Sequence, residues 1–157
     1  MIDRAPDLFA PPPHAHHVTA RDGEAFVWQI SPRIVLKKAS GILSGPLIQC
    51  FVDFFQPILK PGARIRVFGD LAGLTHYTAE ARELATAFTI ARRSAVDSIH
   101  LLGESKFLAL AFGSYGSNVG PGVVSVYSDR DSFLRSLARA LNEPPQIPGA
   151  PRAALLP

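Results

Sequence analysis

The chain is short of sulfur: its 157 residues include one cysteine and one methionine. A single cysteine excludes an intramolecular disulfide and is typical of a reducing compartment, so we expect a cytoplasmic protein. Cys50 stands beside Phe51 and Val52, which indicates a packed thiol rather than a reactive one.

Charge is also scarce. Only 18% of the residues are charged, the formal net charge is +3, and 47% are hydrophobic, which is typical of one globular domain. The basic residues are scattered and cluster only as three pairs, Lys37 with Lys38, Arg64 with Arg66, and Arg92 with Arg93. A nucleic-acid-binding protein usually carries a longer basic stripe with interleaved aromatic residues, so we expect no nucleic-acid partner.

No clean apolar run of membrane length occurs. The most apolar stretch, residues 42–59, is barely long enough to span a bilayer and is interrupted by Pro46, Asp53 and Pro57. The first 17 residues carry acidic residues and prolines where a secretory signal needs a basic start and an apolar run. We therefore expect a buried amphipathic helix, no membrane insertion and no signal peptide.

Catalytic and metal-binding motifs are missing as well. The chain has no G-x-S-x-G elbow, no phosphate loop and no paired metal ligands. The glycine-rich stretch 116–122 leads from a helix into a strand, the reverse of the order that presents helix amides to a phosphate. Three close histidines lack a carboxylate or cysteine at supporting spacing, which favours a solvated arm over a metal site: His14, His16 and His17. We expect no metal, no cofactor and no catalytic residues.

What the chain does contain is an alternation of strands and helices. The hydrophobic pattern predicts strands at 24–30, 34–40, 65–68, 96–102 and 123–127, and helices at 44–56, 78–91, 106–114 and 128–141. The first two strands should form an antiparallel hairpin, because only a short turn joins them. Strands that then alternate with helices predict an α/β fold with a mixed, mostly parallel sheet of about five strands and about four helices.

The proline content divides the chain into three parts. Residues 1–22, with the triple proline at 11–13, are predicted to form a flexible arm. Residues 23–142 form the predicted domain. Residues 143–157 are rich in proline and are predicted to be a disordered tail.

The order of elements and three short motifs resemble the STAS domain and its SpoIIAA-like relatives. Residues 40–43 (SGIL) are similar to that family's step into the first helix, and residues 70–75 (DLAGLT) to its strand-end segment. Residues 101–110 are similar to the fourth strand and the following short helix of the SpoIIAA-like branch. The resemblance covers about residues 24–141 and implies a STAS-like fold and a bacterial regulatory role.

The resemblance also implies where a switch would lie. In anti-anti-sigma members an Asp-Ser pair opens the second helix, and the serine accepts a phosphate from a partner kinase. The matching positions here are Thr78 and Ala79, and alanine cannot be phosphorylated. The resemblance therefore implies a module without the usual serine switch, in which Thr75 and Thr78 keep a residual possibility of phosphorylation.

Two functions remain from this reasoning. The first is a non-enzymatic protein-interaction or regulatory module, acting through the predicted loop over 70–78 and the neighbouring helix starts: Asp70, Thr75, His76, Thr78, Glu80 and Ser105. The same ends hold a carboxylate, a histidine and hydroxyls, but polar residues gather at loop ends in any α/β domain, so we expect no enzyme. The apolar excess on the first helix leaves a homodimer open.

The alternative function is a SpoIIAA-like carrier of a small lipophilic ligand. SpoIIAA-like relatives resemble lipid-binding folds, and the helices here are unusually apolar. Such a carrier would place aromatic and aliphatic side chains around an internal pocket. The candidate lining is Phe51, Phe55, Phe107, Leu110 and Phe112.

Overall fold

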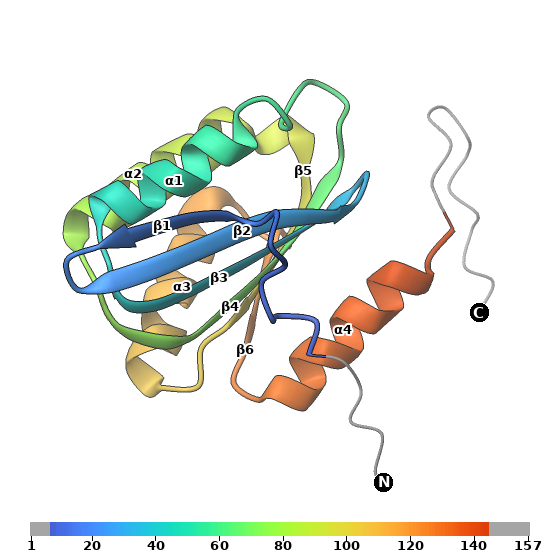
Figure 1. Cartoon of the computed structure of the whole chain (residues 1–157). Helices are drawn as coiled ribbons and strands as arrows, with labels where there is room; N and C mark the ends of the chain where they lie inside the picture. The colour runs from blue at the N-terminus through green and yellow to red at the C-terminus, as the bar shows by residue number, and fades with distance from the viewer. Residues whose placement is uncertain (1–6, 145–157) are drawn as a thin grey trace, which may run out of the picture.

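A computed structural model describes residues 7–144 of the chain. Its frame is one six-stranded sheet in the sequential order β1 to β6 (Figure 1). The strands are β1 His16–Ala20, β2 Gly23–Ser31, β3 Ile34–Leu43, β4 Ile65–Tyr77, β5 Val96–Leu102 and β6 Val124–Tyr127. Strands β1 and β3 each pair antiparallel with β2, and β3 to β6 are parallel. The predicted mixed α/β sheet is confirmed, with one strand more than expected.

Four helices cover the sheet, α1 Gly45–Phe55, α2 Ala79–Ala91, α3 Lys106–Val119 and α4 Arg130–Asn142, and a short 3-10 turn spans Arg93–Ala95. Helices α1, α2 and α3 lie on one face and α4 on the other (Figure 1). Each parallel connection moves to the next strand in the same direction, so right-handed crossovers place all three connecting helices on one face. Helix α4 follows the last strand and is free of that constraint.

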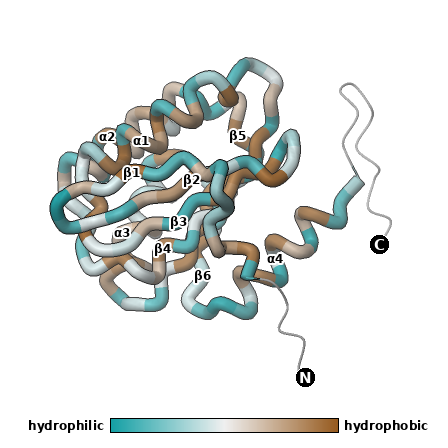
Figure 2. Tube along the Cα trace, viewed as in Figure 1, coloured by the Kyte–Doolittle hydropathy of each residue, from teal (hydrophilic) through white to brown (hydrophobic). Residues whose placement is uncertain are grey.

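The sheet separates two buried clusters of apolar side chains. The larger lies under α1, α2 and α3, and the smaller lies under α4 on the second face. Hydrophobic residues follow the strands and the inner sides of the helices, whereas the turn between β1 and β2 is hydrophilic (Figure 2). The central strands are therefore packed on both faces, as expected for parallel strands with helices on either side.

The N-terminal segment is more ordered than predicted. Residues 16–20 were expected in a flexible arm, but they form β1, which pairs antiparallel with β2 from His16↔Val27 to Ala20↔Gly23. Upstream, Phe9 is 1% exposed and packs on Trp28 and Phe133 in the second-face cluster. The prediction of a flexible arm is therefore wrong for these residues, because one buried aromatic ring and one short strand attach the segment to the sheet.

The segment after the predicted strand at 65–68 is not a loop but the continuation of β4. Leu71, Leu74 and Tyr77 are buried in the larger cluster at intervals of three residues. In each of these two intervals β4 has one residue more than the segment of β3 that it pairs with. These two bulges keep all three side chains on the same face of the sheet. A spacing of three is neither the strand nor the helix period, which is why the pattern predicted a loop.

Two other expectations concern helices. Helix α3 extends to Val119, beyond the predicted end at residue 114, and takes in part of the glycine-rich stretch. Helix α1 ends at Phe55, close to the expected break before Pro57. Its apolar side chains pack within the chain: Val52 and Phe54 join the larger cluster, and the ring of Phe54 lies against that of His16 in β1. The apolar excess on α1 is therefore accounted for without a second subunit. The predicted disordered tail beyond residue 144 lies outside the described residues.

Candidate functional site

The carboxyl end of β4 and the starts of α2 and α3 form one polar and apolar surface. Thr75 and His76 are exposed on the last residues of β4. Thr78 accepts a hydrogen bond from Ala81 N at 3.1 Å, and Ser105 accepts one from Leu108 N at 3.1 Å. Both hydroxyl groups therefore cap helices, as expected for residues at these positions. The predicted partner residues Thr75, His76, Thr78 and Ser105 do lie around these strand and helix ends.

An exposed aromatic pair joins this surface to α3. The rings of His76 and Phe107 are stacked, with centroids 6.1 Å apart and an interplanar angle of 8°. Phe107 is 47% exposed and Leu110, one turn further along α3, is 76% exposed. The prediction that these two residues line a pocket is wrong, because they stand on the outer side of α3. Phe112 is 1% exposed and packs on Tyr77, so it belongs to the core.

Asp70 does not belong to this surface. It is 5% exposed in the middle of β4, and its carboxylate receives two hydrogen bonds from Arg130, at 2.8 and 3.3 Å. Arg130 is the first residue of α4 and also lies 3.7 Å from Glu104. The prediction of Asp70 as a partner contact is wrong, because a carboxylate buried in a strand is paired within the chain and holds α4 to the sheet.

Glu80 also has a role within the fold. Its carboxylate lies over Gly45, where an added Cβ would stand 2.6 Å from the carboxylate carbon. Ser44 precedes α1 without making a side-chain cap, and its buried hydroxyl oxygen has no hydrogen-bond partner among the described residues. The exposed Glu80 carboxylate thus places negative charge at the starts of both α1 and α2.

A small cavity lies between the sheet and the helices of the first face. Its volume is about 50 Å³, and both Phe51 and Phe55 line it, as predicted for a pocket. An engineered protein cavity that binds benzene measures about 150 Å³. The cavity is therefore too small for a lipid chain in this arrangement.

The sequence reasoning missed the charged residue that lines this cavity, Lys37. It alternates along β3 with Val35 and Ala39, which are buried on the same face. Burial lowers the pKa of Lys37 to about 8. The strand period around Lys37 was a signal that this lysine points inward, whereas the adjacent Lys38 points to the other face.

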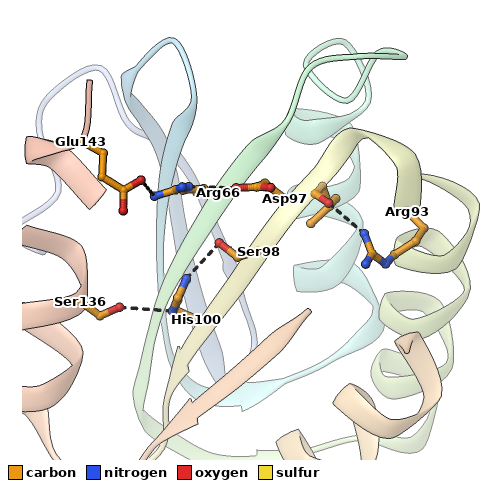
Figure 3. Close-up of polar contacts among 8 residues, drawn as sticks. Arg66, Arg93, Asp97, Ser98, His100, Ser136 and Glu143 are labelled. Carbon is orange, nitrogen blue, oxygen red and sulfur yellow. Dashed lines mark hydrogen bonds and ion pairs between the residues drawn. The ribbon is translucent and has the colours of Figure 1, made fainter. Parts of the chain in front are cut away.

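The second face carries a hydrogen-bonded network around His100 of β5 (Figure 3). Its Nδ1 lies 2.9 Å from the Tyr127 hydroxyl, its Nε2 lies 3.0 Å from Ser98 Oγ, and its ring stacks on Phe68 at 4.3 Å. The Tyr127 hydroxyl in turn donates to Ser136 Oγ at 2.9 Å. Burial, with a smaller contribution from the positive charge of Arg66, lowers the pKa of His100 to about 4. The imidazole is therefore neutral near pH 7 and joins β5, β6 and α4.

Asp97, on the same strand as His100, is paired with an arginine rather than with this network. Asp97 pairs with Arg66 at 3.0 Å, and Arg66 also pairs with Glu143 at 2.6 Å, just after α4 (Figure 3). Arg66 thus ties the end of α4 to β4 as Arg130 ties its start. Over residues 7–144 no group of three or more histidine, cysteine or acidic side chains has a metal-binding arrangement. In the same range, no helix combines the length and apolarity that a bilayer crossing requires.

Taken together, the sheet order and the helix placement define a SpoIIAA-like fold of the STAS type. The chain superimposes on an uncharacterised protein of the DUF3478 family with a SpoIIAA-like fold from Shewanella loihica, with a TM-score of 0.54, 14% identity, and 76% of this chain and 97% of that one covered. It also superimposes on the unphosphorylated anti-sigma factor antagonist SpoIIAA, with a TM-score of 0.52, 13% identity, and 71% and 95% of the two chains covered. At these identities the likeness concerns the fold.

Sequence comparison adds no closer assignment. No protein-family model matches the chain, and no curated protein matches it. The fold that the residue motifs predicted is therefore confirmed by structural similarity alone, and the function has to be argued from the surface of this chain.

Proposed function

We propose that the chain is a non-enzymatic interaction module of the STAS type that binds a protein partner through the end of β4 and the start of α3. The observation that carries this proposal is the stack of His76 on Phe107, with Leu110 exposed beside it. Large apolar side chains exposed together on a helix next to polar groups are typical of a protein-binding surface. We call Thr75, His76, Thr78, Ser105, Phe107 and Leu110 the docking surface.

The groups that an enzyme would need are used for structure. Thr78 and Ser105 accept the capping hydrogen bonds of α2 and α3. Asp70 is paired with Arg130, so it is not available to orient His76. This supports a binding role rather than a catalytic one for the docking surface.

The position of the expected switch supports a module that works without serine phosphorylation. Ala79 is the first residue of α2, and Thr78 uses its hydroxyl as the cap. A phosphate on Thr78 would replace a cap that the helix already has. We therefore propose that partner binding depends on the apolar pair on α3 and not on a phosphorylated residue.

Affinity capture with matched variants tests this function. We expect Phe107→Glu to abolish capture of the partner, because a carboxylate replaces the apolar centre of the docking surface. Ile90→Glu is the control, since Ile90 is 51% exposed at the opposite end of α2. A partner captured by the wild type and by Ile90→Glu but not by Phe107→Glu supports the proposal. A partner captured equally by all three removes the docking surface, provided that circular dichroism shows all three folded.

A further inference from the structure

A cleft lies at the amino ends of the parallel strands. It is bounded by the turn between β2 and β3, the beginnings of β3, β4 and β5, and the end of α4. Its volume is about 360 Å³. The docking surface lies at the carboxyl end of β4, so the cleft and the docking surface are at opposite ends of the sheet. The cleft is therefore a separate candidate for a ligand of this chain.

Arginine dominates the charged lining of the cleft, which contains Arg33, Arg64 and Arg66. The two carboxylates of the lining belong to Asp97 and Glu143, and both pair with Arg66, which lies between them (Figure 3). Arg33 and Arg64 bring two further positive charges. Three arginines against two carboxylates leave the lining with a net charge of +1. The cleft therefore favours an anion over a cation.

The backbone fixes the positions of the two outer arginines. Arg33 N donates a hydrogen bond to Ser31 Oγ at 3.4 Å, and Arg33 O accepts one from Arg66 N at 2.7 Å. Arg64 has a φ of 52°, in the left-handed region, which is strained for a residue with a Cβ. The same turn uses a glycine, Gly62, for its other positive φ. Strain of this kind is typical of ligand-binding sites, which supports a role for the Arg64 side chain in the cleft.

The remaining wall of the cleft is largely apolar. Ile34 and Ala140 are buried, whereas Leu141 is 40% exposed. Pro32 and Pro144 line the cleft as well. An engineered protein cavity of about 150 Å³ holds a benzene ring, and the cleft is more than twice as large. It therefore has room for two fused rings with one acid group, and an apolar surface for the rings.

We propose that the cleft binds an aromatic monocarboxylate of one or two rings, with its carboxylate on Arg33 and Arg64 and its rings against Ile34 and Leu141. A planar guanidinium matches a carboxylate through two parallel hydrogen bonds and also stacks on aromatic faces. Each guanidinium has five N–H donors, so a contact within the chain does not exhaust them. The net charge of +1 favours a monoanion over the dianion of a phosphate monoester.

Binding of naphthoate to the full-length protein tests this inference. Titration calorimetry at constant ionic strength compares sodium naphthoate with naphthylmethanol, which has the rings without the charge, and with sodium acetate, which has the charge without the rings. A fourth titration uses naphthyl phosphate. We expect saturable binding of naphthoate, and binding of naphthylmethanol and acetate that is weaker by about tenfold or more, since each lacks one half of the recognition.

Two pairs of arginine variants locate the site. Arg33→Gln combined with Arg64→Asn removes both outer charges, and asparagine tolerates the left-handed conformation at position 64. This double variant should weaken naphthoate binding by about tenfold or more, the usual worth of a hydrogen bond to a charged group. Arg82→Gln combined with Arg135→Gln is the control with the same change of charge, because both arginines are exposed and neither lines the cleft. The control should bind as the wild type does.

Three results would overturn the inference: no saturable naphthoate binding, equal binding by the cleft double variant, or equal binding of naphthylmethanol by the wild type. Naphthyl phosphate bound more tightly than naphthoate would also overturn it, since the cleft would then be a site for phosphate monoesters. The comparison of the four compounds on the wild type decides the question even if the cleft double variant fails to fold.

Discussion

At the scale of single residues, the most consequential side chain is Lys37. Its ammonium lies on the core face of β3, and its pKa is lowered to about 8 by burial. The unfolded chain holds this proton up to the ordinary lysine pKa of 10.5. Between these two values the unfolded state therefore binds more protons than the folded state, and stability rises with pH.

Lys37→Met should accordingly raise the free energy of unfolding at pH 7, by about 1 to 3 kcal/mol, because it removes a desolvated charge without shortening the side chain. The advantage of the variant over the wild type should be complete below pH 8 and should disappear as pH rises toward 10.5. Urea unfolding at pH 7 and pH 10 measures both values. Lys38→Met is the control and should show no such pH-dependent gain. A constant difference between Lys37→Met and the wild type would contradict the assignment.

Phe9 is the residue that attaches the N-terminal segment. It is 1% exposed between Trp28 and Phe133, whereas its neighbour Leu8 is 41% exposed. We expect Phe9→Ala to cost about 3 to 5 kcal/mol of stability, as for other buried phenylalanines. Leu8→Ala should stay within about 0.5 kcal/mol of the wild type. Chemical denaturation of the two variants measures the contrast, and equal effects would mean that the segment is not anchored by this ring.

At the scale of elements, much of the fold was predictable because regular periods mark regular elements. The strands β2, β3 and β5, the cap of α2 at Thr78 and the break of α1 before Pro57 follow from alternation, cap residues and proline. The second half of β4 was not predictable in this way, because its bulges turn the strand period of Leu71, Leu74 and Tyr77 into a spacing of three. Strand β1 was missed because it is short, contains polar residues such as His16, His17 and Thr19, and follows a run of prolines.

The candidate site was predictable only in part, for a related reason. Cap residues such as Thr78 and Ser105 are found from sequence, since their position before a helix defines them. The burial of Asp70 depends on Arg130, which lies 60 positions away in the sequence. The exposure of Phe107 and Leu110 depends on which side of α3 meets the sheet. Contacts between distant segments decide both outcomes.

Helix α4 is held by an ion pair at its start, and this gives a prediction for the element as a whole. Arg130→Met should destabilise the protein by about 1 to 3 kcal/mol, because it leaves the buried Asp70 carboxylate without its partner. Adding Asp70→Asn to that variant should recover much of the loss. Arg135→Met on the exposed side of α4 is the control. Unfolding experiments that give additive losses for the pair would contradict a direct interaction.

At the scale of the whole molecule, the cavity and the docking surface lie in different parts of the fold. Side chains of three helices and of the sheet line the cavity with Lys37 on the first face, while α4 and Phe9 cover part of the second. The docking surface lies where β4 continues beyond β5 and pairs with β3 alone, beside the start of α3. This geometry places His76 next to Phe107, at the carboxyl end of β4.

Photo-crosslinking in the cell of origin tests the docking surface most directly. A photoreactive p-benzoylphenylalanine replaces Leu110, which is 76% exposed, and in a second variant it replaces Ile90, which is 51% exposed at the far end of α2. We predict that irradiation joins a discrete protein partner to position 110 and not to position 90, and that Phe107→Glu in the same chain suppresses the adduct. The absence of an adduct at position 110, or the same adducts at both positions, would contradict the proposed surface.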